Sequence, residues 1–216
     1  MRRLLVGCIA AVLGACASQP PALPPPPASA TVADLTAAVL ADSQRSDGAS
    51  DAKIRGDLAD DAMNNAKACV DRFPQTGACL YVRALGLGLQ ARSHPPDAIG
   101  LLNSMLMDLG SAEDLDPNFD HAGPSRVRAL VLLRAPAWPL GPGDADSALE
   151  WARRAVMLQP QYPPNLLALA ETQAKTGDAP NAADNYAKAR KLAEAMPASA
   201  DRADWLRQAE AGLGGK

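Results

Sequence analysis

Apolar residues recur along the chain with the period of an α-helix. In the segment 165–176, Leu166 and Leu169 fall on one face. In the segment that follows, Tyr186 and Ala189 share a face in the same way. We find no convincing alternation of apolar and polar residues, the pattern of a strand, beyond the N-terminal apolar run. The pattern therefore predicts an all-α protein.

Helix-breaking and capping residues divide this pattern into separate helices. Gly177 suits the left-handed end of one helix, Asp178 suits the N-cap of the next, and Pro180 suits that helix's first turn. We expect helices at 33–42, 51–73, 77–93, 95–109, 124–134, 144–158, 165–176 and 200–213, with another beginning after Asp178. The first and the last helix are expected to cap the two ends of the array, with Trp205 on the packed face of the last.

The stretch 135–143 interrupts the helical pattern. It contains three prolines and two glycines, which forbid a regular helix, so we expect an ordered loop there. Trp138 lies in the middle of this loop. It either anchors a partner at the surface or packs the loop onto the core, and packing is the favoured interpretation.

The C-terminal third repeats itself with a period of 34 residues. The recurring pairs are Gly143 and Gly177, Asp144 and Asp178, Ala148 and Ala182, Ala155 and Ala189, and Leu158 and Leu192. A 34-residue period with small residues at the helix crossings resembles the tetratricopeptide repeat (TPR). The resemblance implies a TPR-like solenoid of stacked antiparallel helix pairs, with the clearest repeats at 124–160 and 163–195. Gln173 departs from the family pattern, because a tyrosine is usual there.

The N-terminus has a secretory layout. Arg2 and Arg3 precede ten apolar residues, 4–13, which are too few to span a bilayer because a spanning helix needs about 20. The sequence Leu-Gly-Ala-Cys that ends at Cys16 resembles the lipobox of bacterial lipoproteins. The resemblance implies a signal peptide at 1–15 and a lipid on Cys16. The alternative is an ordinary cleaved signal with an incidental cysteine.

The residues after Cys16 bear on location and spacing. Ala17, rather than an aspartate, favours the outer membrane by the sorting rule of enteric lipoproteins, with the protein facing the periplasm. We interpret 16–30 as a linker, because six prolines at 19–30 favour an extended chain. It is either a spacer or a tail that is disordered by its composition. The folded domain is expected at 31–216.

Charge and composition exclude several functions. The chain has 21 basic and 24 acidic residues, and removal of a signal that contains Arg2 and Arg3 leaves a net charge of −5. Nucleic acid is therefore not an expected partner. No catalytic motif is found, and His94 and His121 lack metal-ligand spacing to a cysteine. We expect no enzyme, no catalytic residue, no metal and no cofactor.

Cys69 and Cys79 flank a turn almost symmetrically. If helices run up to and away from that turn, the two side chains meet across an antiparallel helix pair. An exported protein in an oxidising compartment favours a disulfide bond between them. Two buried thiols that act as small apolar groups are the alternative.

A TPR-like solenoid offers a concave surface lined by the first helix of each pair. By repeat position, the residues expected there are Arg83, Gln90, Arg126, Glu171 and Lys175, with Trp138 as a further candidate contact. Polar side chains on such a surface can hold an extended peptide or a partner's helix. Each of them is equally compatible with an ordinary solvated side chain.

The segments 121–126 and 135–140, within the whole layout from lipobox to repeats, resemble lipoproteins related to the T-component of TRAP transporters. That resemblance implies a lipid-anchored periplasmic scaffold that binds a solute-binding protein, and it allows self-association into a homo-oligomer. Two other functions compete with it. One is an adaptor for outer-membrane assembly or pili, and the other is a hydrolase, which requires a compact polar pocket that the sequence does not indicate.

Overall fold

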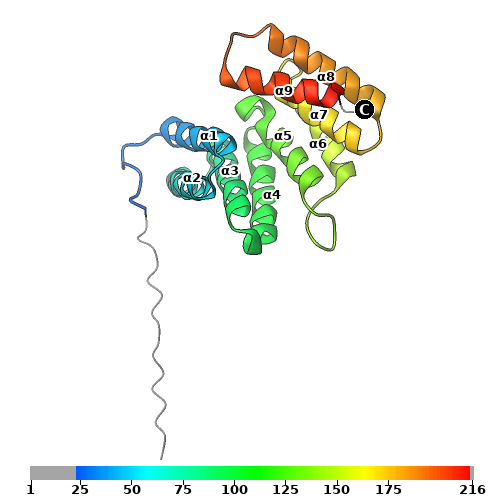
Figure 1. The fold of residues 1–216 in the computed structure, drawn as a ribbon. Helices are drawn as coiled ribbons and strands as arrows, with labels where there is room; N and C mark the ends of the chain where they lie inside the picture. Colours follow the sequence, from blue (N-terminus) through cyan, green and yellow to red (C-terminus); the bar gives the residue numbers. More distant parts are fainter. Residues whose placement is uncertain (1–22, 215–216) are drawn as a thin grey trace, which may run out of the picture.

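The computed structural model describes residues 23–214, and this part of the chain is all-helical. Its helices are α1 (Val32–Gly48), α2 (Ala52–Arg72), α3 (Gly77–Ser93), the short 3₁₀ helix η1 (Pro95–Asp97), α4 (Ala98–Leu115), α5 (Phe119–Arg134), α6 (Ala145–Leu158), α7 (Pro163–Lys175), α8 (Ala179–Glu194) and α9 (Ala200–Gly214) (Figure 1). The expected all-α class is confirmed. The expected signal peptide, Cys16 and the first part of the expected linker lie outside the described residues.

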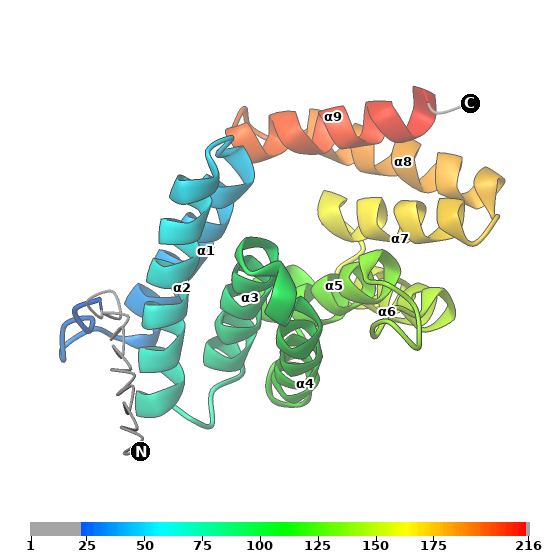
Figure 2. The same ribbon diagram turned by 60° about the horizontal axis from the view of Figure 1, so that its bottom comes forward.

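The helices are arranged as four consecutive pairs followed by a single helix. In each pair, α1–α2, α3–α4, α5–α6 and α7–α8, the two helices pack against each other. The first helices also pack in order, α1 on α3, α3 on α5 and α5 on α7, while α9 covers α8 and α7. The pairs follow a curve that brings α1 and α9 toward each other (Figure 2). This is the stacking expected of a TPR-like solenoid, in which each repeat buries its apolar face against its neighbours.

Small residues let the helices approach closely. Ala59, Ala62 and Ala66 lie along one face of α2 and are fully buried in a cluster with Leu109 of α4 and neighbouring residues. At the C-terminal end, Trp205 of α9 packs on a second apolar cluster, as expected for a capping helix. Alanine at these crossings brings backbones together and removes apolar surface from water with little loss of side-chain entropy.

The ends of most helices follow the capping residues in the sequence. Asp144 accepts hydrogen bonds from the backbone N–H groups of Asp146 and Ser147 and so begins α6. Gly177 has φ +87°, the left-handed conformation that glycine adopts without a Cβ clash. Asp178 stands at the N-cap of α8 but makes no backbone cap bond, so the expected side-chain cap is wrong. Its carboxylate instead accepts from the amide of Asn181.

Three helix boundaries differ from the sequence expectation by five residues or more. α1 continues past residue 42 to Gly48 because the polar end of this helix still buries Ser46. α4 runs on to Leu115 because Leu109 and Ala112 continue its buried face. α5 begins at Phe119, ahead of the expected start at Pro124, and contains a non-helical turn that is described below.

The last part of the proline-rich linker is bound to α2. The amide of Asn64 donates to the carbonyl of Pro24 at 2.9 Å. Arg72 donates from Nη1 to the carbonyl of Pro27 at 2.8 Å and from Nη2 to that of Pro26 at 2.9 Å. Prolines in an extended chain keep their carbonyls free to accept such bonds. From Pro24 onward, the segment is therefore part of the folded body rather than a free spacer.

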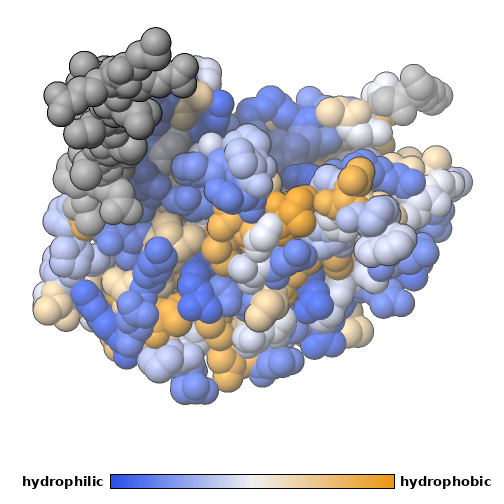
Figure 3. Space-filling view, turned by 90° about the horizontal axis from the view of Figure 1, so that it is seen from below, coloured by the Kyte–Doolittle hydropathy of each residue, from blue (hydrophilic) through white to orange (hydrophobic). Residues whose placement is uncertain are grey.

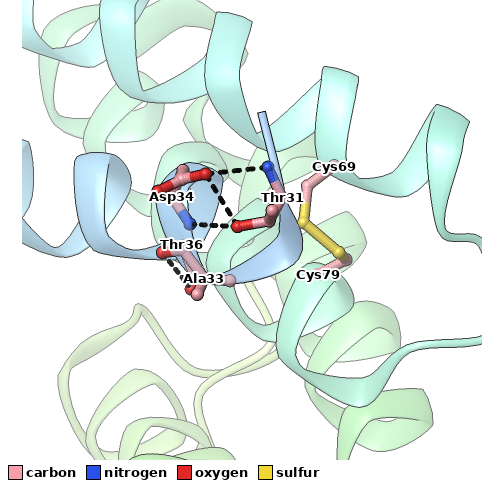
Figure 4. The surroundings of a disulfide bond; sticks show 6 residues. All are labelled: Thr31, Ala33, Asp34, Thr36, Cys69 and Cys79. Atoms are coloured by element: carbon pink, nitrogen blue, oxygen red, sulfur yellow. Dashed lines mark hydrogen bonds between the residues drawn. A yellow bond between two sulfur atoms is a disulfide. The ribbon is translucent and has the colours of Figure 1, made fainter. Parts of the chain in front are cut away.

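A disulfide bond joins α2 to α3 (Figure 4). Cys69 and Cys79 are both fully buried, and their sulfur atoms are 2.01 Å apart. The bond packs against Leu35 near the start of α1, where Thr31 and Asp34 cap each other reciprocally. The sequence left a disulfide and two free thiols as alternatives, and the structure contains the disulfide.

Candidate partner-binding site on the concave face

The inner side of the curve contains a polar cavity of about 540 Å³. We call it the polar cavity. α1, α3, α5 and α9 surround it together with the turn before α7. Its lining residues include Leu40, Ser43, Gln44, Asp47, Tyr81, Leu85, Asp120, Arg126, Tyr162, Asp201, Trp205 and Gln208.

A left-handed turn lies at this cavity. Asp120, His121 and Ala122 have φ values of 48°, 55° and 62°, although none of them is glycine. Each such residue costs roughly 1–2 kcal/mol relative to a right-handed conformation. Surrounding contacts must therefore stabilise this turn, and residues held in this way often lie at functional sites.

Arg126 and Asn165 supply those contacts. Arg126 Nη1 donates to the carbonyls of Asp120 at 3.0 Å and His121 at 3.1 Å. Asn165 Nδ2 donates to the carbonyl of His121 at 3.0 Å, and its Oδ1 accepts from Arg126 Nη1 at 3.1 Å. Arg126 is 8% exposed and Asn165 is fully buried. Two buried side chains from α5 and α7 thus hold the turn through its own carbonyls.

The carboxylate of Asp120 receives two further donors. Tyr81 Oη donates to Asp120 Oδ2 at 2.5 Å, and Arg126 Nη2 donates to the same oxygen at 2.7 Å. Burial raises the pKa of the Tyr81 phenol well above its usual value, and the positive charge of Arg126 partly opposes this rise. Tyr81 therefore acts as a neutral hydrogen-bond donor at any physiological pH.

An aromatic wall continues from this network toward α9. The rings of His121 and Tyr162 stack at 4.3 Å, and Tyr162 meets Trp205 edge to face at 5.5 Å. Arg126 lies over the Tyr162 ring, 5.2 Å from its centre. Offset and edge-to-face aromatic pairs of this kind are individually favourable and present broad apolar surface to a ligand.

A second hollow of about 400 Å³ adjoins the polar cavity and is largely apolar. It lies among α1, α3, α4, α5 and the start of the following loop, and it shares Ser43, Asp47 and Leu85 with the polar cavity. Its apolar lining includes Leu89, Leu102, Met105, Val127, Leu130, Val131 and Pro136. We call the two hollows together the concave groove.

Charged side chains at the rim of the concave groove are paired. Arg92 donates to Asp47 at 2.7 Å, and Arg134 contacts Glu171 at 2.5 Å. At the seam between the first and last helices, Gln44 of α1 donates to Asp201 of α9 at 3.4 Å. One weak hydrogen bond thus bridges the two ends of the solenoid on this side.

The six residues that the sequence predicts for the concave surface do not all lie there in the structure. Arg126 lines the polar cavity, and Glu171 pairs with Arg134 at the rim. Arg83 instead binds Asp108 of α4 through two hydrogen bonds, and Gln90 donates to Asp60 of α2. These two residues line neither hollow, since they face the flanking helices, and Lys175 is exposed and also lines neither.

Trp138 is 86% exposed. The favoured expectation that it packs its loop onto the core is therefore wrong. The loop is held by its own backbone contacts and does not need the indole for packing.

Sequence reasoning missed Tyr81, Asp120 and Tyr162. Tyr81 occupies a core position of α3, so its sequence position indicates a packing role only. Asp120 comes before the expected start of its helix. The left-handed turn brings the polar atoms of Tyr81 and Asp120 together and stacks His121 on the Tyr162 ring. No glycine within the turn indicates it in the sequence.

Two kinds of feature are absent from the described residues 23–214. No group of three or more histidine, cysteine, aspartate or glutamate side chains there is placed to hold a metal ion. None of the helices in that range has the length and apolar character of a membrane span.

Comparison with solved structures supports the fold. The chain is similar to a thermophilic TPR protein from Thermus thermophilus, with a TM-score of 0.58 and 22% sequence identity over 84% of this chain and 92% of that one. No protein-family profile matches the sequence. A search of curated proteins also gave no match. The likeness shows a TPR-like fold.

Proposed function

We propose that this protein is a lipid-anchored scaffold of the bacterial envelope that binds another protein through the concave groove. The continuity of the groove carries the proposal. Its polar cavity and its apolar hollow share three lining residues, so one bound segment reaches both. Such a segment gains affinity from apolar side chains in one half and register from polar contacts in the other.

Two features support a location in the envelope. The lipobox-like sequence that ends at Cys16 supports lipid attachment, most simply at the outer membrane facing the periplasm. The disulfide between Cys69 and Cys79 is the kind of bond that persists in oxidising compartments. A cytosolic protein of this fold would keep these thiols reduced.

We further propose a TRAP-type solute-binding protein as the partner. The support is the resemblance of segments 121–126 and 135–140 to T-component lipoproteins. The first of these segments forms part of the left-handed turn and supplies Arg126, so it contributes directly to the polar cavity. An assembly or pilus adaptor would use the same groove for a different protein, and the experiment below distinguishes the two.

The test is photo-crosslinking in cells. A photoreactive amino acid replaces Ser43, which lines both hollows, in a chain with Cys16 intact and an affinity tag at its C-terminus. The matched control carries the same group at Ser104, an exposed serine of α4 that lines neither hollow. We expect a crosslinked solute-binding protein from position 43 and none from position 104.

Other outcomes are equally informative. Crosslinks from position 43 to secretion, pilus or barrel-assembly proteins would replace the transport partner with an assembly partner. Equal crosslinking from both positions, or crosslinks only between copies of the chain, would contradict binding of a partner in the concave groove. The mass of the purified tagged chain itself reports independently whether a lipid is attached at Cys16.

A further inference from the structure

The loop between α5 and α6 exposes two large apolar side chains. Trp138 is 86% exposed and Leu140 is 75% exposed. Single exposed apolar residues are common, but a tryptophan and a leucine two residues apart at such exposure are a typical sign of a contact surface. Neither residue contributes to the concave groove.

Backbone contacts within the loop hold these two side chains in their exposed positions. The N–H of Gly143 donates to the carbonyl of Pro136 at 2.8 Å, and that of Leu140 donates to the carbonyl of Ala137 at 3.0 Å. Gly141 lies so close to the carbonyl of Pro136 that a Cβ would come within 2.7 Å of it. Because the loop is already ordered, binding through it loses little conformational entropy.

The surroundings of the loop suit an apolar medium. No ionisable residue occurs from Ala135 to Gly143. Ile99 of α4 packs against Gly141 and is itself 37% exposed, so the apolar surface extends beyond the loop. Seen from below, hydrophobic residues spread across the middle of the molecule (Figure 3). A charge-free loop with an exposed indole favours the lipid–water interface, where tryptophan is enriched.

The tether directs this face toward a membrane. Only seven residue steps separate Cys16 from Leu23, the first described residue, and a fully extended chain of that length spans at most about 25 Å. The loop and the N-terminal end of the described chain both extend to the lower side of the molecule in Figure 1. A lipid on Cys16 therefore keeps the bilayer close to that side.

We propose that the loop Ala135–Gly143 is a second membrane contact, which places Trp138 and Leu140 in the surface of a phospholipid bilayer. The proposal rests on the lipid anchor in the proposed function. The anchor holds the protein at the membrane, and the loop fixes which face it turns to the lipid. The concave groove then has a defined orientation relative to the bilayer.

The test uses the acylated full chain in phosphatidylcholine vesicles. Leu140→Cys carries an environment-sensitive fluorescent label on its thiol, which is unique because Cys69 and Cys79 are bonded and Cys16 is acylated. Met157→Cys is the matched control, since Met157 is 70% exposed and lies at the opposite end of α6 from the loop. We expect a blue shift and quenching by nitroxide lipids at position 140, and quenching by aqueous iodide at position 157.

Three results would overturn the proposal. Equal quenching by iodide at both positions means that the loop stays in water. Energy transfer between labels on different copies at position 140 identifies a second copy of this chain as the occupant. An unacylated Cys16 removes the anchor and contradicts the proposed function as well, whereas acylation with a water-exposed loop contradicts the loop contact alone.

Discussion

Arg126 is the residue on which the contacts of the concave face converge. Its guanidinium binds two carbonyls and the carboxylate of the left-handed turn, the side chain of Asn165, and the face of Tyr162. One buried cation thus stabilises a backbone conformation that Asp120, His121 and Ala122 would not adopt on their own. The polar cavity depends on this residue for its shape as well as its charge.

Removal of that cation tests this role. Arg126→Met removes one donor from each of the carbonyls of Asp120 and His121 and leaves the Asp120 carboxylate without its cationic partner, so we expect it to lower the free energy of unfolding by about 3–5 kcal/mol. Arg92→Met, which removes an exposed ion pair with Asp47, should cost about 0–1 kcal/mol. Urea unfolding measures both. Similar losses for the two variants would show that Arg126 does not stabilise the turn.

Gly123 provides space for Tyr81. A Cβ at Gly123 would lie 2.7 Å from the Tyr81 ring, which buried neighbours prevent from moving aside. We expect Gly123→Ala to cost about 1–3 kcal/mol through this overpacking. Gly56→Ala in α2 meets nothing within 4 Å and should be neutral or gain up to about 1 kcal/mol. The melting temperature should fall for the Gly123 variant and stay unchanged or rise for the Gly56 variant. A lower melting temperature for both would contradict the steric explanation.

Single-residue chemistry was only partly predictable from the sequence. Arg126 could be selected by its repeat position, but its partners could not, because three consecutive left-handed residues without glycine have no local sequence signal. Arg83 and Gln90 could be selected by repeat position in the same way, but they bind residues of α4 and α2. Repeat position assigns a helix face only approximately, and the curvature of the solenoid decides what that face meets.

At the scale of elements, the sequence predicts helices best where backbone chemistry ends them. The turns after α2, α3 and α7 contain proline or glycine, and their positions agree with the structure within one residue. α1 and α4 instead extend beyond their expected ends, to Gly48 and Leu115, because buried residues such as Ser46 and Ala112 continue their packed faces. The 34-residue period identifies the pairing of α5 with α6 and α7 with α8, because small residues recur at their crossings.

The turn between α7 and α8 needs a glycine. Gly177 has φ +87°, so Gly177→Ala places a Cβ in a conformation that costs about 1 kcal/mol. Gly48→Ala at the end of α1 is the control, since Gly48 has no positive φ and an added Cβ meets nothing within 4 Å. Chemical denaturation should show a loss at position 177 and none at position 48. A loss at both would point to a general effect of removing glycine.

The disulfide restrains the pair α2–α3. Replacement of both Cys69 and Cys79 with serine opens a loop with a sequence separation of 10, and we expect a loss of about 2–3 kcal/mol. A reducing agent should lower the melting temperature of the natural chain and leave that of the double variant unchanged. If reduction does not alter the natural chain, the bond does not contribute to stability.

For the whole molecule, curvature creates the candidate site. The lining of the concave groove comes from α1, α3, α4, α5 and α9, so no single repeat contains it. The sequence predicts a solenoid and a concave side, but the closeness of α1 to α9 depends on small rotations summed over every pair. The positions of the repeats in the sequence do not give this accumulated rotation.

A groove variant links this shape to binding. Leu130→Arg introduces a charge into the apolar hollow, and we expect at least about a tenfold loss of partner affinity with little change in the fold. Met107→Arg, on an exposed part of α4 outside both hollows, should bind normally. Calorimetric titration with the captured partner measures both affinities, and circular dichroism checks the fold. Equal affinity in the two variants would locate the partner elsewhere.

The docked proline segment also has a mechanical consequence. Any pull on the chain upstream of Pro24 reaches the fold through Asn64 and Arg72 of α2, before it can act on α1. α2 is the helix that Cys69 fastens covalently to α3. A force applied upstream of Pro24 would therefore be shared by two helices and a covalent bond, and the residues that receive it, Asn64, Arg72 and Cys69, do not line the concave groove.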